Sequence, residues 1–168
     1  MNEYTLCRRV PVRARYDVLV AGSGPSGICA AVSAARLGAR TAVVERYGVV
    51  GGNLTGGSVG PIMGSVARGT MRDELTGRLL VGFNDIQGKV GRVHDMERAK
   101  QTLFEFLREA GVDVYLQSPV VDALMEGGAV RGVVIGGKTG LYALEADRVV
   151  DASGDGDVAF FADAPCEF

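Results

Sequence analysis

Near its start the chain contains the sequence Gly22-Ser23-Gly24-Pro25-Ser26-Gly27, whose spacing suits the binding of a pyrophosphate group. In the pattern G-x-G-x-x-G the first glycine permits a tight turn, the second lets the backbone approach the phosphates, and the third lets a helix pack against a strand. Free N–H groups at the start of that helix face the anion, and proline suits its first turn because the missing N–H costs nothing there. These residues are therefore candidates for binding a dinucleotide: Gly22, Gly24, Pro25, Ser26 and Gly27.

The segments that flank these glycines give the pattern its meaning. Tyr16–Gly22 is a short apolar run that ends in glycine, as expected for a strand buried on both faces. The alanine-rich segment that follows breaks at Gly38 and predicts a helix, and Arg40–Arg46 predicts a second buried strand. A strand, a helix and a strand within about thirty residues predict a right-handed βαβ unit with parallel strands.

Glu45, at the end of the second predicted strand, adds a further signal. A carboxylate at this place holds the ribose hydroxyls of an adenosine. Its negative charge would repel a 2′-phosphate, so NADP is disfavoured, and the neighbouring Arg46 is the only contrary feature. FAD and NAD share this half-site, so both stay open at this point, with Glu45 and Arg46 as candidate binding residues.

From the stretch Tyr16–Gly57 onward, over nearly all of its length, the chain resembles the amino-terminal part of FAD-dependent oxidoreductases of the glutathione-reductase-like flavoprotein superfamily. In such flavoproteins a glycine-rich loop after the glutamate runs under the diphosphate and ribityl chain of the cofactor. Gly51, Gly52 and Asn53 match that loop. The resemblance therefore favours FAD over NAD.

The later part of the chain predicts a strand, Val112–Leu116, and then a small antiparallel meander. Its three alternating runs are separated by turns at Gly127-Gly128 and Lys138-Thr139-Gly140. In the resembling flavoproteins such a meander precedes the last strand of the FAD-binding unit, and the residue at Val121 contacts adenine through its backbone. Val120 or Val121 is thus a further candidate.

Near the end of the chain, Asp147–Gly154 predicts a buried strand that ends in a turn of small residues. Ala152-Ser153-Gly154 leave room for the dinucleotide and match the A-[ST]-G segment of the resembling family. We expect Asp151 at the strand end, and Asp155 or Asp157 as the cap of the next helix, holding polar groups near the cofactor; Asp155 is counted with the binding residues. No metal is predicted, because a calcium loop would need a twelfth-position glutamate and flanking helices.

The middle of the chain, Leu54 to Arg92, is the least informative. Four apolar residues there have helical spacing and predict a packing face: Met71, Leu75, Leu79 and Leu80. His94, the only histidine, precedes Asp95, a good N-cap for a helix over Met96–Gly111. A lone histidine at a helix start is more often structural than catalytic. Since no nucleophile or redox dithiol can be recognised either, the catalytic residues stay unknown.

Composition excludes several classes of protein. The 168 residues have a formal charge of −2 and dispersed basic residues, which speaks against a nucleic-acid partner. Three distant cysteines without a CxxC fit a reducing, cytoplasmic location: Cys7, Cys29 and Cys166. The uncharged segment Val18–Ala35 has the length of a signal or membrane anchor, but its glycines and proline break it, and no membrane association is expected.

Together these observations predict an α/β fold over residues 1–168: a Rossmann-like parallel sheet with flanking helices and a small antiparallel β meander, forming an incomplete FAD domain of an oxidoreductase. The resemblance covers only the front of the family, without its substrate region or its late glycine-aspartate segment. Alternatives stay open: an NAD-binding domain, a truncated flavoprotein, or a non-catalytic FAD-binding fragment that needs a second copy or a partner subunit. Substrate and electron acceptor are not predicted.

Overall fold

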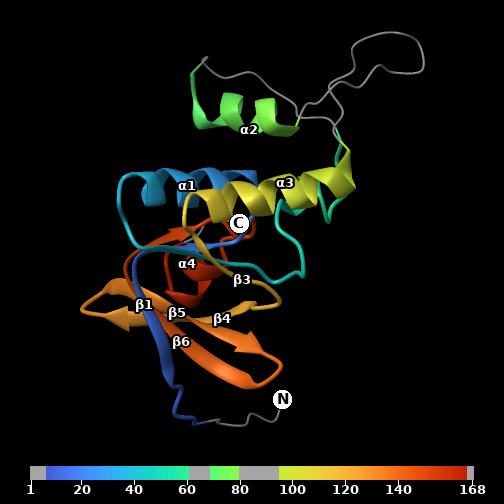
Figure 1. Cartoon of the computed structure of the whole chain (residues 1–168). Helices are drawn as coiled ribbons and strands as arrows, with labels where there is room; N and C mark the ends of the chain where they lie inside the picture. The colour runs from blue at the N-terminus through green and yellow to red at the C-terminus, as the bar shows by residue number, and fades with distance from the viewer. Residues whose placement is uncertain (1–6, 61–68, 80–94, 166–168) are drawn as a thin grey trace, which may run out of the picture.

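The computed structural model describes residues 7–60, 69–79 and 95–165, and within them the strands form one six-stranded sheet of order β3-β2-β1-β6-β5-β4 (Figure 1). The strands β3, β2, β1 and β6 run parallel, whereas β6, β5 and β4 are antiparallel. This is the predicted Rossmann-like sheet extended at one edge by the predicted meander. The strands are β1 (Val12–Ala21), β2 (Thr41–Val44), β3 (Asp113–Tyr115), β4 (Val120–Glu126), β5 (Ala129–Gly137) and β6 (Gly140–Asp151).

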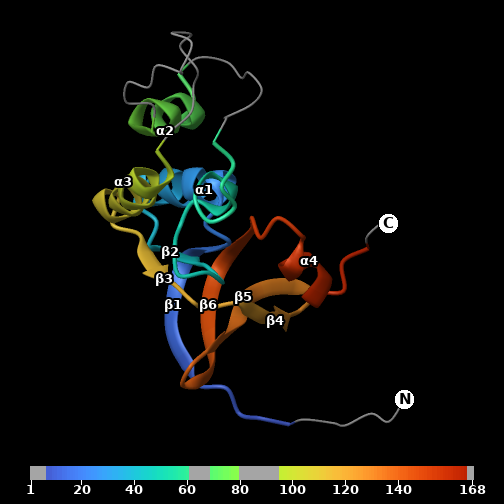
Figure 2. The same ribbon diagram turned by 90° about the vertical axis from the view of Figure 1, so that its right-hand side faces the viewer.

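The described helices are α1 (Pro25–Arg36), α2 (Met71–Leu79), α3 (Met96–Glu109) and the short α4 (Asp157–Phe161). Helices α1 and α3 lie side by side against the parallel strands, and α2 lies on their outer side (Figures 1 and 2). Helix α4 lies against the meander (Figure 2). As predicted, Asp95 caps α3, because its carboxylate accepts hydrogen bonds from the N–H groups of Glu97 and Arg98.

Two apolar cores lie on the two faces of the sheet. The first packs β1 and β2 against α1, α2 and α3, with Ile28 and Phe106 fully buried. The second packs the opposite face of β1 and β2 against β5, β6 and α4, with Leu19 and Leu144 at its centre. The end of β1, Val18–Ala21, and the whole of β2 are covered on both faces and are almost continuously apolar, whereas the first half of β1, which begins before the predicted strand, is charged and largely exposed.

Strand β6 differs from the prediction. The last run of the meander and the last parallel strand were expected as separate strands, but β6 is continuous over Gly140–Asp151. Its first half pairs with β5, from Gly140 to Glu145, and the strand also pairs with β1, from Ala143 to Asp151. No turn residue interrupts the sequence between these parts, so one strand belongs to both the meander and the parallel sheet.

The uncharged segment Val18–Ala35 is divided between β1 and α1 by the glycine turn, so it is not a single helix. No helix in residues 7–60, 69–79 or 95–165 is long and apolar enough to span a membrane.

Helix α2 packs through the face that the sequence indicated. Leu75 and Leu79 are buried in the first core and Met71 packs at its edge, while Leu80 and His94 lie outside the described residues. The guanidinium of Arg36 on α1 donates two hydrogen bonds to Glu74 on α2, at 2.6 and 2.8 Å. Helix α2 is thus held on α1 by both apolar and charged contacts.

Candidate cofactor-binding site

A cavity of about 810 Å³ lies at the carboxyl ends of the parallel strands. Its walls come from five segments of the chain, within residues 21–26, 44–49, 52–57, 118–120 and 152–157. Strand β1 is flanked by β2 on one side and by β6 on the other, so the strands that follow β1 in the chain lie on opposite sides of it and the strand order reverses there. In α/β sheets, ligands bind outside the carboxyl ends of the strands at such a switch point.

The glycines of the first motif are needed for two different reasons. A Cβ on Gly22, whose φ is +98°, would lie 2.3 Å from the carbonyl oxygen of Ala152, and one on Gly27 would lie 2.0 Å from the carbonyl oxygen of Gly22. These two glycines therefore allow the turn, β6 and α1 to pack closely. A Cβ on Gly24 would meet no atom within 4 Å, so the space over Gly24 is open.

The amino terminus of α1 opens onto this space. Gly24 is its N-cap, and no side chain caps the helix. The first intrahelical hydrogen bond runs from the N–H of Ile28 to the carbonyl oxygen of Gly24. The preceding N–H groups of the first turn therefore suit an anion such as a pyrophosphate.

The second glycine loop lies directly on the first. The N–H of Gly51 donates to the carbonyl oxygen of Ser23 at 2.8 Å, and a Cβ on Gly52 would lie 2.9 Å from the Cα of Gly24. Gly51 has a φ of +108° and precedes the short 3₁₀ turn Gly52–Leu54. Gly52 and Asn53 line the cavity, whereas Gly51 supports the loop from behind.

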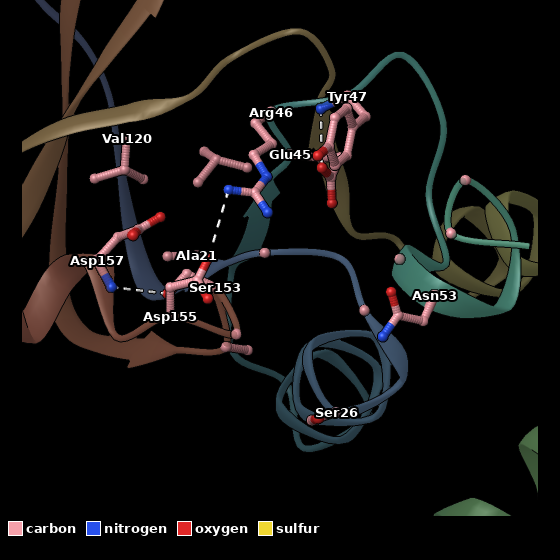
Figure 3. A pocket seen from close by; sticks show the side chains of 18 of the residues that line it. Ala21, Ser26, Glu45, Arg46, Tyr47, Asn53, Val120, Ser153, Asp155 and Asp157 are labelled. Atoms are coloured by element: carbon pink, nitrogen blue, oxygen red, sulfur yellow. Dashed lines mark hydrogen bonds and ion pairs between the residues drawn. The ribbon is translucent and has the colours of Figure 1, made fainter. Parts of the chain in front are cut away.

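Glu45 lies at the end of β2, and only 5% of it is exposed. Its Oε2 accepts hydrogen bonds from the N–H of Ser23 at 3.0 Å and from the Ser23 hydroxyl at 2.5 Å. Its Oε1 accepts a hydrogen bond from the N–H of Tyr47 at 2.9 Å (Figure 3). The carboxylate borders the cavity and is held in one orientation by these donors.

Arg46 and Asp155 come from opposite walls of the cavity and form an ion pair with an N–O distance of 3.7 Å (Figure 3). The Arg46 guanidinium also lies 5.0 Å from the centre of the Tyr47 ring. Both charged side chains are about half exposed or more, so the pair contributes little to stability.

The turn after β6 corrects one prediction. Neither Asp155 nor Asp157 caps α4. Its N-cap is Gly156, which has no side chain to accept a hydrogen bond. Instead Asp151 accepts hydrogen bonds from the N–H and hydroxyl of Ser153 and from the N–H of Ala159. The Ser153 hydroxyl in turn accepts from the N–H of Asp157 at 2.9 Å (Figure 3).

Asp151 is thus the residue that anchors α4 to the turn. Partial burial alone would raise its pKa, but the hydrogen bonds from Ser153, Ala159 and Val158 outweigh this effect and lower the pKa below its ordinary value. The carboxylate therefore stays ionised over the whole neutral range.

The structure brings most of the predicted site residues together around the cavity: Gly22, Gly24, Pro25, Ser26, Glu45, Arg46, Gly52, Asn53, Ala152, Ser153, Gly154 and Asp155. Gly27 and Gly51 support the walls from outside. Of the two candidates in the meander, Val120 lines the cavity, whereas Val121 is 38% exposed and lies outside it. The adenine contact through the backbone of Val121 stays a prediction.

Sequence reasoning missed several lining residues, among them Tyr47, Ser118 and the second glycine pair, Gly56-Gly57. Tyr47 and Gly56-Gly57 adjoin segments that were recognised, so a wider window around Glu45 and Asn53 would have included them. Ser118 follows β3, and only the parallel pairing of β3 with β2 shows that it reaches the site.

Residues 17–168 match the model of a protein family described as FAD dependent oxidoreductase. The chain belongs to this family. The match decides between the two dinucleotides that the first half-site left open: the cofactor is FAD, and the NAD-binding alternative is set aside.

Two curated proteins and one solved structure illustrate what the chain is similar to. The chain is 27% identical to digeranylgeranylglycerophospholipid reductase of Thermoplasma acidophilum, over 83% of this chain and 39% of that protein. It is 30% identical to thiamine thiazole synthase of Thermococcus kodakarensis, over 83% of this chain and 58% of that protein. The crystal structure of Thermovibrio ammonificans THI4 superposes with a TM-score of 0.68 and 26% identity, over 88% of this chain and 61% of that one.

The chain thus spans between 39% and 58% of the length of these two curated relatives. The family match identifies this chain as the FAD-binding portion of an oxidoreductase.

Proposed function

We propose that the cavity at the carboxyl ends of β1, β2 and β6 binds FAD in an extended form. The Gly22–Gly27 turn and the start of α1 hold the pyrophosphate, and Glu45 accepts a hydrogen bond from the adenosine ribose. Gly52 and Asn53 border the diphosphate and ribityl chain. Ala152–Asp155 form the opposite wall.

One observation carries this proposal: the open space over Gly24 beside an uncapped helix start. A Cβ at Gly24 would meet nothing within 4 Å, although Gly22, Gly27 and Gly52 on either side have no room for a side chain. A glycine in open space beside free N–H groups fits an anionic ligand that approaches the backbone. With Glu45 at the edge of the same cavity, the residues present fit the adenosine diphosphate half of FAD.

When bound, the flavin supplies the hydride or electron transfer of the reaction. The residues of this chain bind and orient the cofactor: the glycine turns exclude side chains from its path, and the buried carboxylate of Glu45 fixes its ribose end. We infer that the whole protein is a flavin-dependent oxidoreductase.

Titration calorimetry of the purified chain with FAD, ADP and NAD tests the cofactor proposal. FAD should bind most tightly, ADP should retain part of that affinity, and NAD should bind more weakly than FAD. The bound flavin is identified by its visible spectrum after denaturation. Tighter binding of NAD than of FAD would contradict the proposal.

We also propose that a second copy of this chain covers the outer face of α4. Phe160 there is 66% exposed, and its ring meets that of Phe161 edge to face, with the ring centres 5.7 Å apart. Size-exclusion chromatography with light scattering, comparing the wild type with Phe160→Ser, tests this. A wild-type chain that stays monomeric at high concentration would contradict it.

A further inference from the structure

Ser23 occupies a position of the glycine motif at which the pattern accepts any residue, yet it is fully buried. Both of its donors point at one atom. Its backbone N–H lies 3.0 Å, and its hydroxyl 2.5 Å, from Oε2 of Glu45. The shorter distance is typical of a hydroxyl that donates to an ionised carboxylate.

These contacts compensate for the burial of the Glu45 carboxylate. A carboxylate with only 5% of its residue exposed has lost most of its water, and an ionised group in that position is costly unless protein donors replace the water. The two donors of Ser23 and the N–H of Tyr47 do so. Without the hydroxyl, Oε2 would keep one donor among the described residues, the N–H of Ser23.

The arrangement also decides which carboxylate oxygen is available to a ligand. Each oxygen of an ionised carboxylate has about two acceptor positions. Ser23 occupies both positions of Oε2, whereas Tyr47 occupies one position of Oε1. Among the contacts of the described residues, one acceptor position therefore remains, and it is on Oε1.

We propose that Ser23 is the positioning residue for ribose recognition: its hydroxyl saturates Oε2 of Glu45 and presents Oε1 to a ribose hydroxyl of the cofactor. This inference rests on the proposed binding of FAD through Glu45. Ser23 itself does not touch the ribose. Its replacement should therefore weaken the recognition of ribose and leave the binding of the phosphates intact.

The test compares two ligands, ADP and 2′,3′-dideoxy-ADP, which lacks both ribose hydroxyls. The wild type should bind ADP about tenfold to a hundredfold more tightly, as expected for a hydrogen bond to a charged group. In Ser23→Ala this preference should shrink by about threefold to tenfold. The affinity for 2′,3′-dideoxy-ADP should stay within about twofold of the wild type.

Ser33→Ala is the matched control. It also removes a serine hydroxyl, but from a position in α1 that does not line the cavity. It should keep the wild-type preference. Ser23→Cys keeps a similar side-chain volume with a weaker donor and should give an intermediate preference. Thermal melts of every variant check that it is folded, and Ser23→Cys replaces Ser23→Ala if the latter does not fold.

Two results would overturn the inference while FAD binding stands. In the first, Ser23→Ala keeps the full preference for ADP, so that the hydroxyl has no part in recognition. In the second, both ligands weaken equally, as a general loosening of the turn would produce. A wild type that binds both ligands equally would instead refute the role of Glu45 in the proposed function, and this inference with it.

Discussion

Gly52 lies so close to Gly24 that a Cβ built on Gly52 would come within 2.9 Å of the Cα of Gly24. The φ of Gly52 is +53°, in the left-handed region that favours glycine. On Gly24 itself a Cβ would meet nothing within 4 Å. Gly52 is therefore required by the packing of the chain, whereas Gly24 is required, in the proposed binding of FAD, by the ligand.

Substitution of these two glycines should separate folding from binding. Gly24→Val should keep the wild-type melting temperature but lose FAD binding, since its side chain fills the space that the pyrophosphate needs. Gly52→Val should lower the melting temperature itself, because the side chain meets backbone and its φ is strained. Circular dichroism melts and FAD titration measure the two effects.

A control for this pair is Gly77→Val in α2, where a Cβ meets no atom within 4 Å and the cavity is distant. It should retain FAD binding. Normal FAD affinity in Gly24→Val would show that the pyrophosphate does not lie over this glycine.

Glu45→Ala should reduce the affinity for FAD by about tenfold to a hundredfold, because a charge-assisted hydrogen bond of roughly 1.5–3 kcal/mol is lost. The melting temperature should fall as well, since the buried Ser23 hydroxyl loses its acceptor. Glu97→Ala, at a carboxylate whose side chain is 82% exposed, is the control and should change neither quantity appreciably. Unchanged FAD affinity in Glu45→Ala would argue against ribose recognition.

Asp151→Asn should change the response of stability to acid. The pKa of Asp151 is lowered in the folded protein, so its contribution is present above the ordinary value of 3.8 and is lost as the pH falls through the lowered value. The variant should be less stable than the wild type near neutrality and should lose less stability on acidification. Urea unfolding at a series of pH values measures this.

Asp163→Asn serves as the control for the acid experiment, because Asp163 is exposed just beyond α4 and asparagine accepts its φ of +52°. Its stability should follow the wild-type profile. Parallel profiles of Asp151→Asn and the wild type would show that Asp151 does not anchor α4 as the geometry indicates.

Tyr16→Phe should change the response to alkali. Burial, together with the hydrogen bonds to Tyr115 and Asp113, raises the pKa of Tyr16 above its ordinary value of 10.0. The contribution of the neutral phenol is therefore complete below pH 10.0 and is lost as the pH rises toward the raised value. The free energy of unfolding of the variant should be lower at neutral pH and should fall less steeply as the pH rises. Urea unfolding at a series of alkaline pH values measures this, and an equal dependence on pH in the two proteins would contradict it.

The parts of the fold and of the site that the sequence alone could predict are those that depend on residues close together in the sequence. The Gly22–Gly27 turn, the helix after it and Glu45 lie within one βαβ unit, where each glycine, apolar run and charge has a local reason. The Asp95 cap of α3 is local in the same way, because the carboxylate accepts from N–H groups two and three residues ahead. Such features can be recognised from spacing because the chain geometry between them is nearly fixed.

The tertiary structure alone decided which distant groups meet. Asp151, not Asp155 or Asp157, anchors α4, since the bend after β6 carries its carboxylate to the N–H of Ala159. The hydroxyl of Ser23 reaches Glu45 because β1 and β2 pair in parallel and end side by side. Two side chains in different loops can form a hydrogen bond only where strand pairing brings the loops close together. No local sequence pattern determines the distance between the loops.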